Sequence, residues 1–326
     1  MVFFITFLRA VAACLITNAH YTGIYPTDLI ANGGLIGDII FFAVSGYCLA
    51  NIKMNFPRWY SKRVVRCYLP VLIMTAIYML LGFYSLESHN AGWWYVYPTY
   101  YHFVASIVVL YIPFYVILKI DVLKKHIPCI MGIIAIAYAV VYFVFYDKSY
   151  YHIDYVREPM IRFLFMESML LGAYFKLNDK RFKDKFHWYL PLGSVIFFVL
   201  YFGSKLVFSR KPEFAQLQII NQFLIFVLLY FVFRFVMSID GKLTKLPSVI
   251  KSIISFVAKM TLEIYVVQYV IIDLVRGKLP FPVNWLVITG GILVSATVLH
   301  YTCEGILKLS YAIIDKAKKT SKKVTE

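Results

Sequence analysis

Residues 3–20 read FFITFLRAVAACLITNAH, a mostly apolar run that holds one arginine and ends on a histidine. A helix needs about 20 predominantly apolar residues to cross the hydrocarbon core of a membrane. This run therefore predicts a membrane-spanning helix at the start of the chain. No small-residue cleavage site follows it, so we expect the helix to be retained and not removed as a signal peptide.

Runs of the same kind recur to the end of the chain. Of the 326 residues 61% are hydrophobic and only 15% are charged, and the mean hydropathy is +0.72. Soluble domains have roughly a quarter charged residues, so this composition excludes an ordinary water-soluble protein. The sequence predicts one all-α integral membrane domain over residues 1–326, with about ten transmembrane helices, short loops and no appended soluble domain. The predicted spans are 3–20, 33–50, 68–86, 101–118, 128–146, 160–176, 189–204, 217–237, 250–273 and 284–304.

The basic residues predict the orientation of these helices. Of the 33 lysines and arginines, 23 lie in or beside alternate loops and in the C-terminal tail, whereas seven lie in the other loops. Because cytoplasmic loops are enriched in Lys and Arg, both termini are expected in the cytoplasm, with residues 305–326 as a basic cytoplasmic tail. These short clusters account for the formal net charge of +16, so no nucleic-acid partner is expected. The expected location is the cell (cytoplasmic) membrane, as a multi-pass protein in the lipid bilayer.

Arg9 and His20 are the first candidate functional residues. They are eleven residues apart, which places both on one face of a helix, separated by roughly 16 Å along its axis. Ionisable groups inside a span are costly and are functional candidates by default. The alternative is that Arg9 extends to the cytoplasmic headgroups and His20 lies at the outer interface, neither having a catalytic role.

Two further strings follow in the next predicted spans. Residues 37–47, GDIIFFAVSGY, carry Ser45 and Gly46 in mid-helix, where a glycine lets a neighbouring helix approach closely. Residues 62–70, KRVVRCYLP, open a span with three basic side chains. This cluster is either ordinary loop charge or a site for the phosphates of a ligand.

Taken in order, the three strings resemble motifs of the membrane acyltransferase family 3, a family of polytopic O-acyltransferases. That family has an Arg and a His eleven apart in its first helix, then a Phe-Phe-x-x-Ser-Gly-Phe/Tyr string, then Arg-x-x-Arg-x-x-Pro. Arg9 with His20, residues 41–47, and Arg63 with Arg66 are similar to these strings. Further strings that look like those of the family are Tyr101–Tyr111, Leu171–Tyr174, Thr261–Gln268, which ends on Gln where the family has His, and Cys303–Gly305.

The resemblance implies transfer of an acyl group, usually acetyl, from acyl-CoA in the cytoplasm to a hydroxyl of an extracytoplasmic or lipid-linked glycan. It implies that His20 is a general base for this reaction. Arg9 is then expected to stabilise the oxyanion or to grip a phosphate or carbonyl oxygen. The candidates for binding acyl-CoA are Arg63, Arg66 and Ser45. Acyl-CoA is a donor substrate, and neither a bound cofactor nor a metal is expected.

Two other functions remain open from the sequence. A transporter of a polysaccharide or small solute would also use intramembrane charge, although no repeat relates residues 1–160 to 161–326, as transporters often show. A relative that binds a ligand without turning it over is the other alternative, because Gln268 replaces the family histidine.

The remaining ionisable groups in the spans have simpler interpretations. Lys259 with Glu263, and His300 with Glu304, are four residues apart and are expected to pair along their helices. Three residues without such a partner, expected at a cavity or at the membrane interface, are Glu167, Asp273 and His102.

Overall fold

A computed structural model describes residues 2–96 and 101–325, with side chains other than those of residue 311 and residues 313–325. Residues 97–100 of the predicted loop at 87–100, and the last tail residue, lie outside the described residues. The described part is all-α, without a strand. Its helices are α1 Phe3–Ala19, α2 Gly34–Leu49, α3 Phe56–Leu80, α4 Ala91–Val96, α5 His102–Lys119, α6 Asp121–Lys125, α7 Ile127–Phe145, α8 Ile161–Leu177, α9 Asp179–Phe182, α10 Tyr189–Arg210, the 3₁₀ helix η1 Pro212–Leu217, α11 Ile219–Ser238, α12 Asp240–Leu243, α13 Ser248–Lys259, α14 Thr261–Val275 and α15 Val283–Thr325.

The helices are those of a multi-pass membrane protein. Six of them, α3, α5, α7, α10, α11 and the first part of α15, are long and apolar enough to cross a bilayer. The outer helices expose large apolar side chains, such as Ile136 at 67% on α7 and Val195 at 63% on α10. Lipid is the solvent that tolerates such surfaces. Each of the ten predicted stretches contains a helix, but α1 and α2 have only 17 and 16 residues, so the count of ten spans stays a prediction.

The third helix differs from its prediction at both ends. The sequence predicted 68–86, whereas α3 runs over Phe56–Leu80. Hydropathy marks the apolar stretch and not the helix ends, and the basic residues before it are good helix formers that continue the helix into water. Pro57 lies in the first turn, where its missing N–H costs nothing.

The ninth predicted span, 250–273, is two helices. α13 ends at Lys259 and α14 starts at Thr261, with Met260 between them. Neither Pro nor Gly marks this break. The Thr261 hydroxyl donates to the carbonyl of Ala258 at 2.9 Å, which satisfies an acceptor at the end of α13 that would otherwise have none.

The centre of the bundle is the contact of α2 with α1 and α8. A Cβ added to Gly46 would overlap the backbone oxygen of Met169 on α8, and one added to Gly172 would overlap the backbone oxygen of Ala43 on α2. The two helices therefore touch backbone to backbone, as the Ser45-Gly46 pair predicted. This contact fixes the position of α2, and therefore also the position of the α2 residues that form part of the site.

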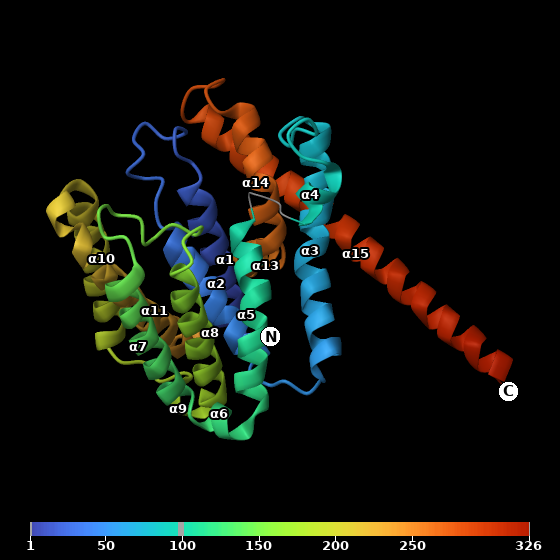
Figure 1. Cartoon of the computed structure of the whole chain (residues 1–326), viewed down its shortest axis with the longest axis horizontal. Helices are drawn as coiled ribbons and strands as arrows, with labels where there is room; N and C mark the ends of the chain where they lie inside the picture. The colour runs from blue at the N-terminus through green and yellow to red at the C-terminus, as the bar shows by residue number, and fades with distance from the viewer. Residues whose placement is uncertain (1, 97–100, 326) are drawn as a thin grey trace.

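The bundle has two chemically different ends. We call the end where α1 stops and α2 starts the His20 end, and the opposite end the Arg9 end. The loop at 21–32, the loop before α8 and the α14–α15 connection gather at the His20 end, whereas α6 and α9 lie at the other (Figure 1). α15 continues well beyond the bundle, and its extension is the basic segment predicted as a tail.

Candidate active site

A cavity of about 650 Å³ lies at the His20 end. α1, α2 and α14 each contribute residues spaced three or four apart, such as Ile16 and the C-cap residue His20 from α1, and Tyr265 and Tyr269 from α14. Residues at these spacings share one helix face. The polar and charged side chains that line the cavity are His20, Asn32, Asp38, His102, Asp154, Tyr155, Arg157, Lys205, Tyr265 and Tyr269.

His20 is held against the cavity wall by Tyr269. The Tyr269 hydroxyl lies 3.4 Å from Nε2 of His20, and the rings meet edge to face with centroids 4.9 Å apart. The Nε2 atom of the imidazole therefore lies within reach of a hydroxyl, and the ring borders the cavity. Ile16, which precedes His20 by one helical turn, is buried, as are Ala12 and Ala13. The histidine therefore lies at the boundary between the core and the cavity.

The loop between α7 and α8 closes one side of the cavity. Asp154 at its centre forms an ion pair with Lys205 of α10 at 2.9 Å and accepts hydrogen bonds from Tyr201 at 3.0 Å and from Gln222 at 2.8 Å. Gln218 accepts from the backbone N–H groups of residues 152 and 153. The carboxylate is thus paired and hydrogen-bonded, the condition under which a buried charge is tolerated.

The loop between α1 and α2 is held in the same way. The Asn18 side-chain amide donates to the carbonyls of Ile30 at 2.7 Å and Asn32 at 3.0 Å, and its oxygen accepts from the Tyr25 hydroxyl. Trp285 of α15 donates to the same hydroxyl at 3.2 Å. The segment that follows His20 is therefore fixed by specific bonds and positions the histidine.

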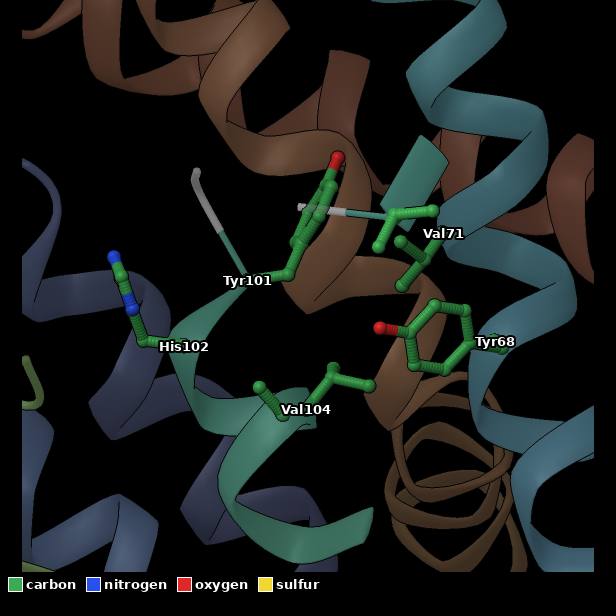
Figure 2. Close-up of a pocket in the computed structure, with 7 residues that line it drawn as sticks. Tyr68, Val71, Tyr101, His102 and Val104 are labelled. Atoms are coloured by element: carbon green, nitrogen blue, oxygen red, sulfur yellow. The ribbon is translucent and has the colours of Figure 1, made fainter. Parts of the chain in front are cut away.

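A second, smaller cavity of about 50 Å³ lies between α3 and the start of α5. Figure 2 shows Tyr68 and Val71 on one side of it and Tyr101 and Val104 on the other, with the His102 ring pointing away from Tyr68. His102 borders both cavities. The small one has room for only a few water molecules, so the large cavity is the one that fits a substrate.

Arg9 lies in a different environment. It is half-buried and interacts electrostatically with Cys48 of α2, Arg66 of α3 and Glu263 of α14. Arg9 is not among the residues that line the large cavity. The structure therefore separates Arg9, the seventh residue of α1, from His20, which directly follows the last residue of the helix, as the spacing along the helix predicted.

The other basic candidates gather around Arg9. Cys48 interacts electrostatically with four cations, which come from α1, α3 and α8: Arg9, Arg63, Arg66 and Lys176. The guanidinium of Arg63 lies 5.9 Å from the centroid of the Trp59 ring, and its Nε has no hydrogen-bond partner among the described residues. This concentration of positive charge suits an anionic ligand.

Ser45 lies beside this basic cluster. Its hydroxyl is hydrogen-bonded to Tyr111 of α5, and Tyr111 also interacts with Cys67 and lies within the field of Arg63. The structure thus brings the three predicted donor-site residues into one region. Lys176 joins them from α8 and was not predicted, because a lysine at the end of a span has the pattern of ordinary loop charge.

The predicted pairing of Lys259 with Glu263 is wrong. Lys259 instead lies 3.7 Å from Glu304, and Glu263 is bonded to Nδ1 of His300 at 2.9 Å. The break after Lys259 removes the helical spacing that would have placed it over Glu263. The predicted pair of His300 with Glu304 is confirmed, at 3.3 Å.

The three residues without a predicted partner have separate outcomes. Asp273 pairs with Arg276 at 3.4 Å. Glu167 is buried on α8, with one carboxyl oxygen lacking a partner in the described chain, and it lines neither cavity. His102 borders both cavities instead of facing only the interface.

Comparison with known families identifies the family of the chain. The family model described as an acyltransferase domain matches residues 2–303, nearly the whole chain. The chain belongs to acyltransferase family 3. The resemblance drawn from the short strings is thereby confirmed. Comparison with the curated proteins and with the solved structures gave no match.

In this acyltransferase, the sequence identified the histidine of the cavity and the basic residues of the opposite end. It missed the residues that complete the cavity wall, chiefly Tyr269, Asp154 and Lys205. Tyr269 follows the family-like string that ends at Gln268 by one residue, and that string was the only signal for it. The loop residues have no periodic pattern, so only the tertiary structure shows that they meet the cavity.

Proposed function

We propose that the chain is a membrane O-acyltransferase of the cell membrane, with ten spans and both termini in the cytoplasm. It moves an acyl group, acetyl in the simplest case, from cytoplasmic acyl-CoA to a hydroxyl of an extracytoplasmic or lipid-linked glycan. The observation that carries the proposal is the position of His20 beside Tyr269 on the wall of the large cavity, at the end opposite the basic cluster. Family membership supplies the reaction class.

The two ends of the bundle suit the two substrates. Arg63 and Arg66, with Arg9 and Lys176, provide cations for the phosphates of acyl-CoA, and Ser45 lies among them. The cavity at the His20 end combines aromatic walls with a few polar groups, as sites for small organic ligands do. The roughly 16 Å along α1 between Arg9 and His20 is spanned by the extended pantetheine arm of the donor.

The reaction follows from this placement. The acceptor oxygen attacks the thioester carbonyl, a C–O bond forms, and the C–S bond to CoA breaks. His20 takes the proton of the acceptor hydroxyl and passes it to the departing sulfur, so that the ester and free CoA leave with all protons accounted for. General base catalysis of this kind contributes about 10²- to 10⁴-fold to the rate.

The test is acyl transfer from radiolabelled acetyl-CoA to surface glycan by the purified protein in lipid nanodiscs. We expect His20→Ala to lower kcat by at least about 100-fold with the KM for acetyl-CoA unchanged. The double variant Arg63→Ala/Arg66→Ala should raise that KM by about tenfold with little change in kcat. Full turnover by His20→Ala would contradict the role of His20, and solute flux without acylation would indicate a transporter instead.

A further inference from the structure

Asp38 is a buried carboxyl that faces the large cavity. It lies on α2, is only 5% exposed, and is one of the residues that line the cavity. No hydrogen bond or ion pair to it occurs within residues 2–96 and 101–325. Buried polar groups are nearly always hydrogen-bonded, so a carboxyl in this position points to a ligand or to water in the cavity.

The helix contacts give the depth of Asp38. A Cβ on Gly34 would lie 2.8 Å from Cβ of Ala19, and one on Gly37 would lie 2.7 Å from Cγ1 of Ile16. α1 and α2 are therefore antiparallel, with Asp38 next to the level of Ile16. That level is one helical turn, about 6 Å, deeper than His20.

α14 also contributes one residue near His20 and one that lies a helical turn deeper, as Asp38 does. Tyr269 contacts His20 at the upper level, and Tyr265 is one turn below it. Asp38 interacts electrostatically with both tyrosines and with Tyr201. The cavity thus has a floor at Asp38 and Tyr265, and an upper wall at His20 and Tyr269.

We propose that Asp38 is the floor of an acceptor-sugar site, where it accepts hydrogen bonds from hydroxyls of the ring whose reacting hydroxyl lies at His20. The proposal rests on the proposed acyltransferase function. The separation of floor and wall is comparable to the width of one pyranose ring, and Phe103, Tyr265 and Tyr269 supply aromatic faces for it. Asp38 is then a specificity-determining residue that selects sugars with a second free hydroxyl.

Binding of sugars tests this directly, without turnover. The probes are methyl glycosides of glucose, galactose, mannose and N-acetylglucosamine, measured by saturation-transfer NMR on the protein in nanodiscs. At least one glycoside should bind the wild type, and Asp38→Ala should weaken it about tenfold, the upper end of the effect of one hydrogen bond. Asp38→Asn keeps the size of the side chain and should also weaken it, because an amide has only one acceptor oxygen.

Glu167→Gln is the matched control, since Glu167 is another buried carboxyl with an unpartnered oxygen but lies outside the cavity. It should leave glycoside binding unchanged. A monodeoxy glycoside that lacks the hydroxyl bound by Asp38 should bind the wild type about tenfold more weakly and bind Asp38→Ala no more weakly than the parent glycoside does. This non-additivity shows direct contact.

Unchanged glycoside binding in both Asp38 variants would overturn the proposal, and so would the absence of glycoside binding by the wild type. Strictly additive losses for the deoxy glycoside would overturn it as well. Acyl transfer is assayed separately on the same preparations. Glycoside binding that depends on Asp38 without any acyl transfer would refute the proposed function while leaving the sugar site standing.

Discussion

His20 owes its position to Tyr269, and the hydroxyl of that tyrosine can be removed without removing the ring. Tyr269→Phe keeps the edge-to-face packing at 4.9 Å, and loses the contact of 3.4 Å to Nε2 together with the interaction of the same hydroxyl with Tyr265. A hydrogen bond of this kind contributes about 0.5–1.5 kcal/mol, so kcat of acyl transfer should fall roughly two- to tenfold with the KM for acetyl-CoA unchanged. The measurement is steady-state kinetics of the purified protein.

The comparison for this prediction is Tyr269→Ala, which loses both the hydroxyl and the ring. It should lower kcat further, because the imidazole then also loses its packing contact with the Tyr269 ring. A kcat for Tyr269→Phe equal to that of the wild type would show that ring packing alone positions His20.

At the scale of helices, the contact of α2 with α8 leaves no room for a methyl group. Gly46→Ala and Gly172→Ala should each destabilise the fold by about 1–3 kcal/mol or more, the usual cost of overpacking a tight core, because the obstructing atoms are backbone. Thermal unfolding in detergent would show this as a lowered midpoint. Both glycines are in mid-helix, so backbone strain of the glycine itself is not involved.

Gly203→Ala is the control for this pair. Gly203 lies in α10 and nothing lies within 4 Å of an added Cβ. Alanine favours a helix over glycine by up to about 1 kcal/mol, so its midpoint should stay equal or rise. A similar loss in all three variants would argue against close packing as the cause.

The loop before α8 depends on Asp154. Asp154→Ala removes the ion pair to Lys205 and the hydrogen bonds from Tyr201 and Gln222, which leaves buried groups without partners at a cost of about 3–5 kcal/mol. The loop should then open more often, and trypsin should cut faster after the exposed Arg157. Limited proteolysis followed by mass spectrometry measures this rate.

Asp147→Asn serves as the comparison, because Asp147 is in the same loop but bonds locally to Ser149, to its backbone N–H at 2.9 Å and to its side chain. Its cleavage rate should match that of the wild type. Equal rates for the Asp154 variant would mean that the loop is held by its packing and not by the carboxylate.

At the scale of the whole molecule, the two ends of the bundle should face opposite sides of the membrane. A cysteine introduced at Thr27, between α1 and α2, should react with a membrane-impermeant maleimide in intact cells, whereas one at Ser321 in the tail should react only after the cells are opened. The same two reporters test the charge asymmetry, because cytoplasmic loops carry the excess of Lys and Arg.

The labelling is read on a background without the five native cysteines, of which Cys14, Cys48 and Cys129 are exposed in the bundle. Labelling of both reporters in intact cells would contradict the predicted orientation. Labelling of neither, before or after the cells are opened, would also contradict it.

The sequence alone determined the membrane class, the helical content and the acyltransferase family. These depend on hydropathy, composition and short strings, and each is local along the chain. The residues that it identified, Arg9, His20, Arg63 and Arg66, were found because a charge inside or beside an apolar run is unusual and therefore visible. Helix ends were less well predicted, as α3 shows. An apolar run indicates which segment lies away from water, but it does not indicate which hydrogen bonds end the helix.

Only the tertiary structure decided what surrounds these residues. The cavity joins side chains from α1, α2, α5, α10, α14 and the loop before α8, and Tyr269 meets His20 across 249 positions of sequence. The tertiary structure also redirected Lys259 to Glu304, by breaking a helix that looked continuous in the sequence. Such contacts depend on which helix faces pack together. That choice is made by the whole bundle, because each face gains its free energy only from the neighbour against which it is buried.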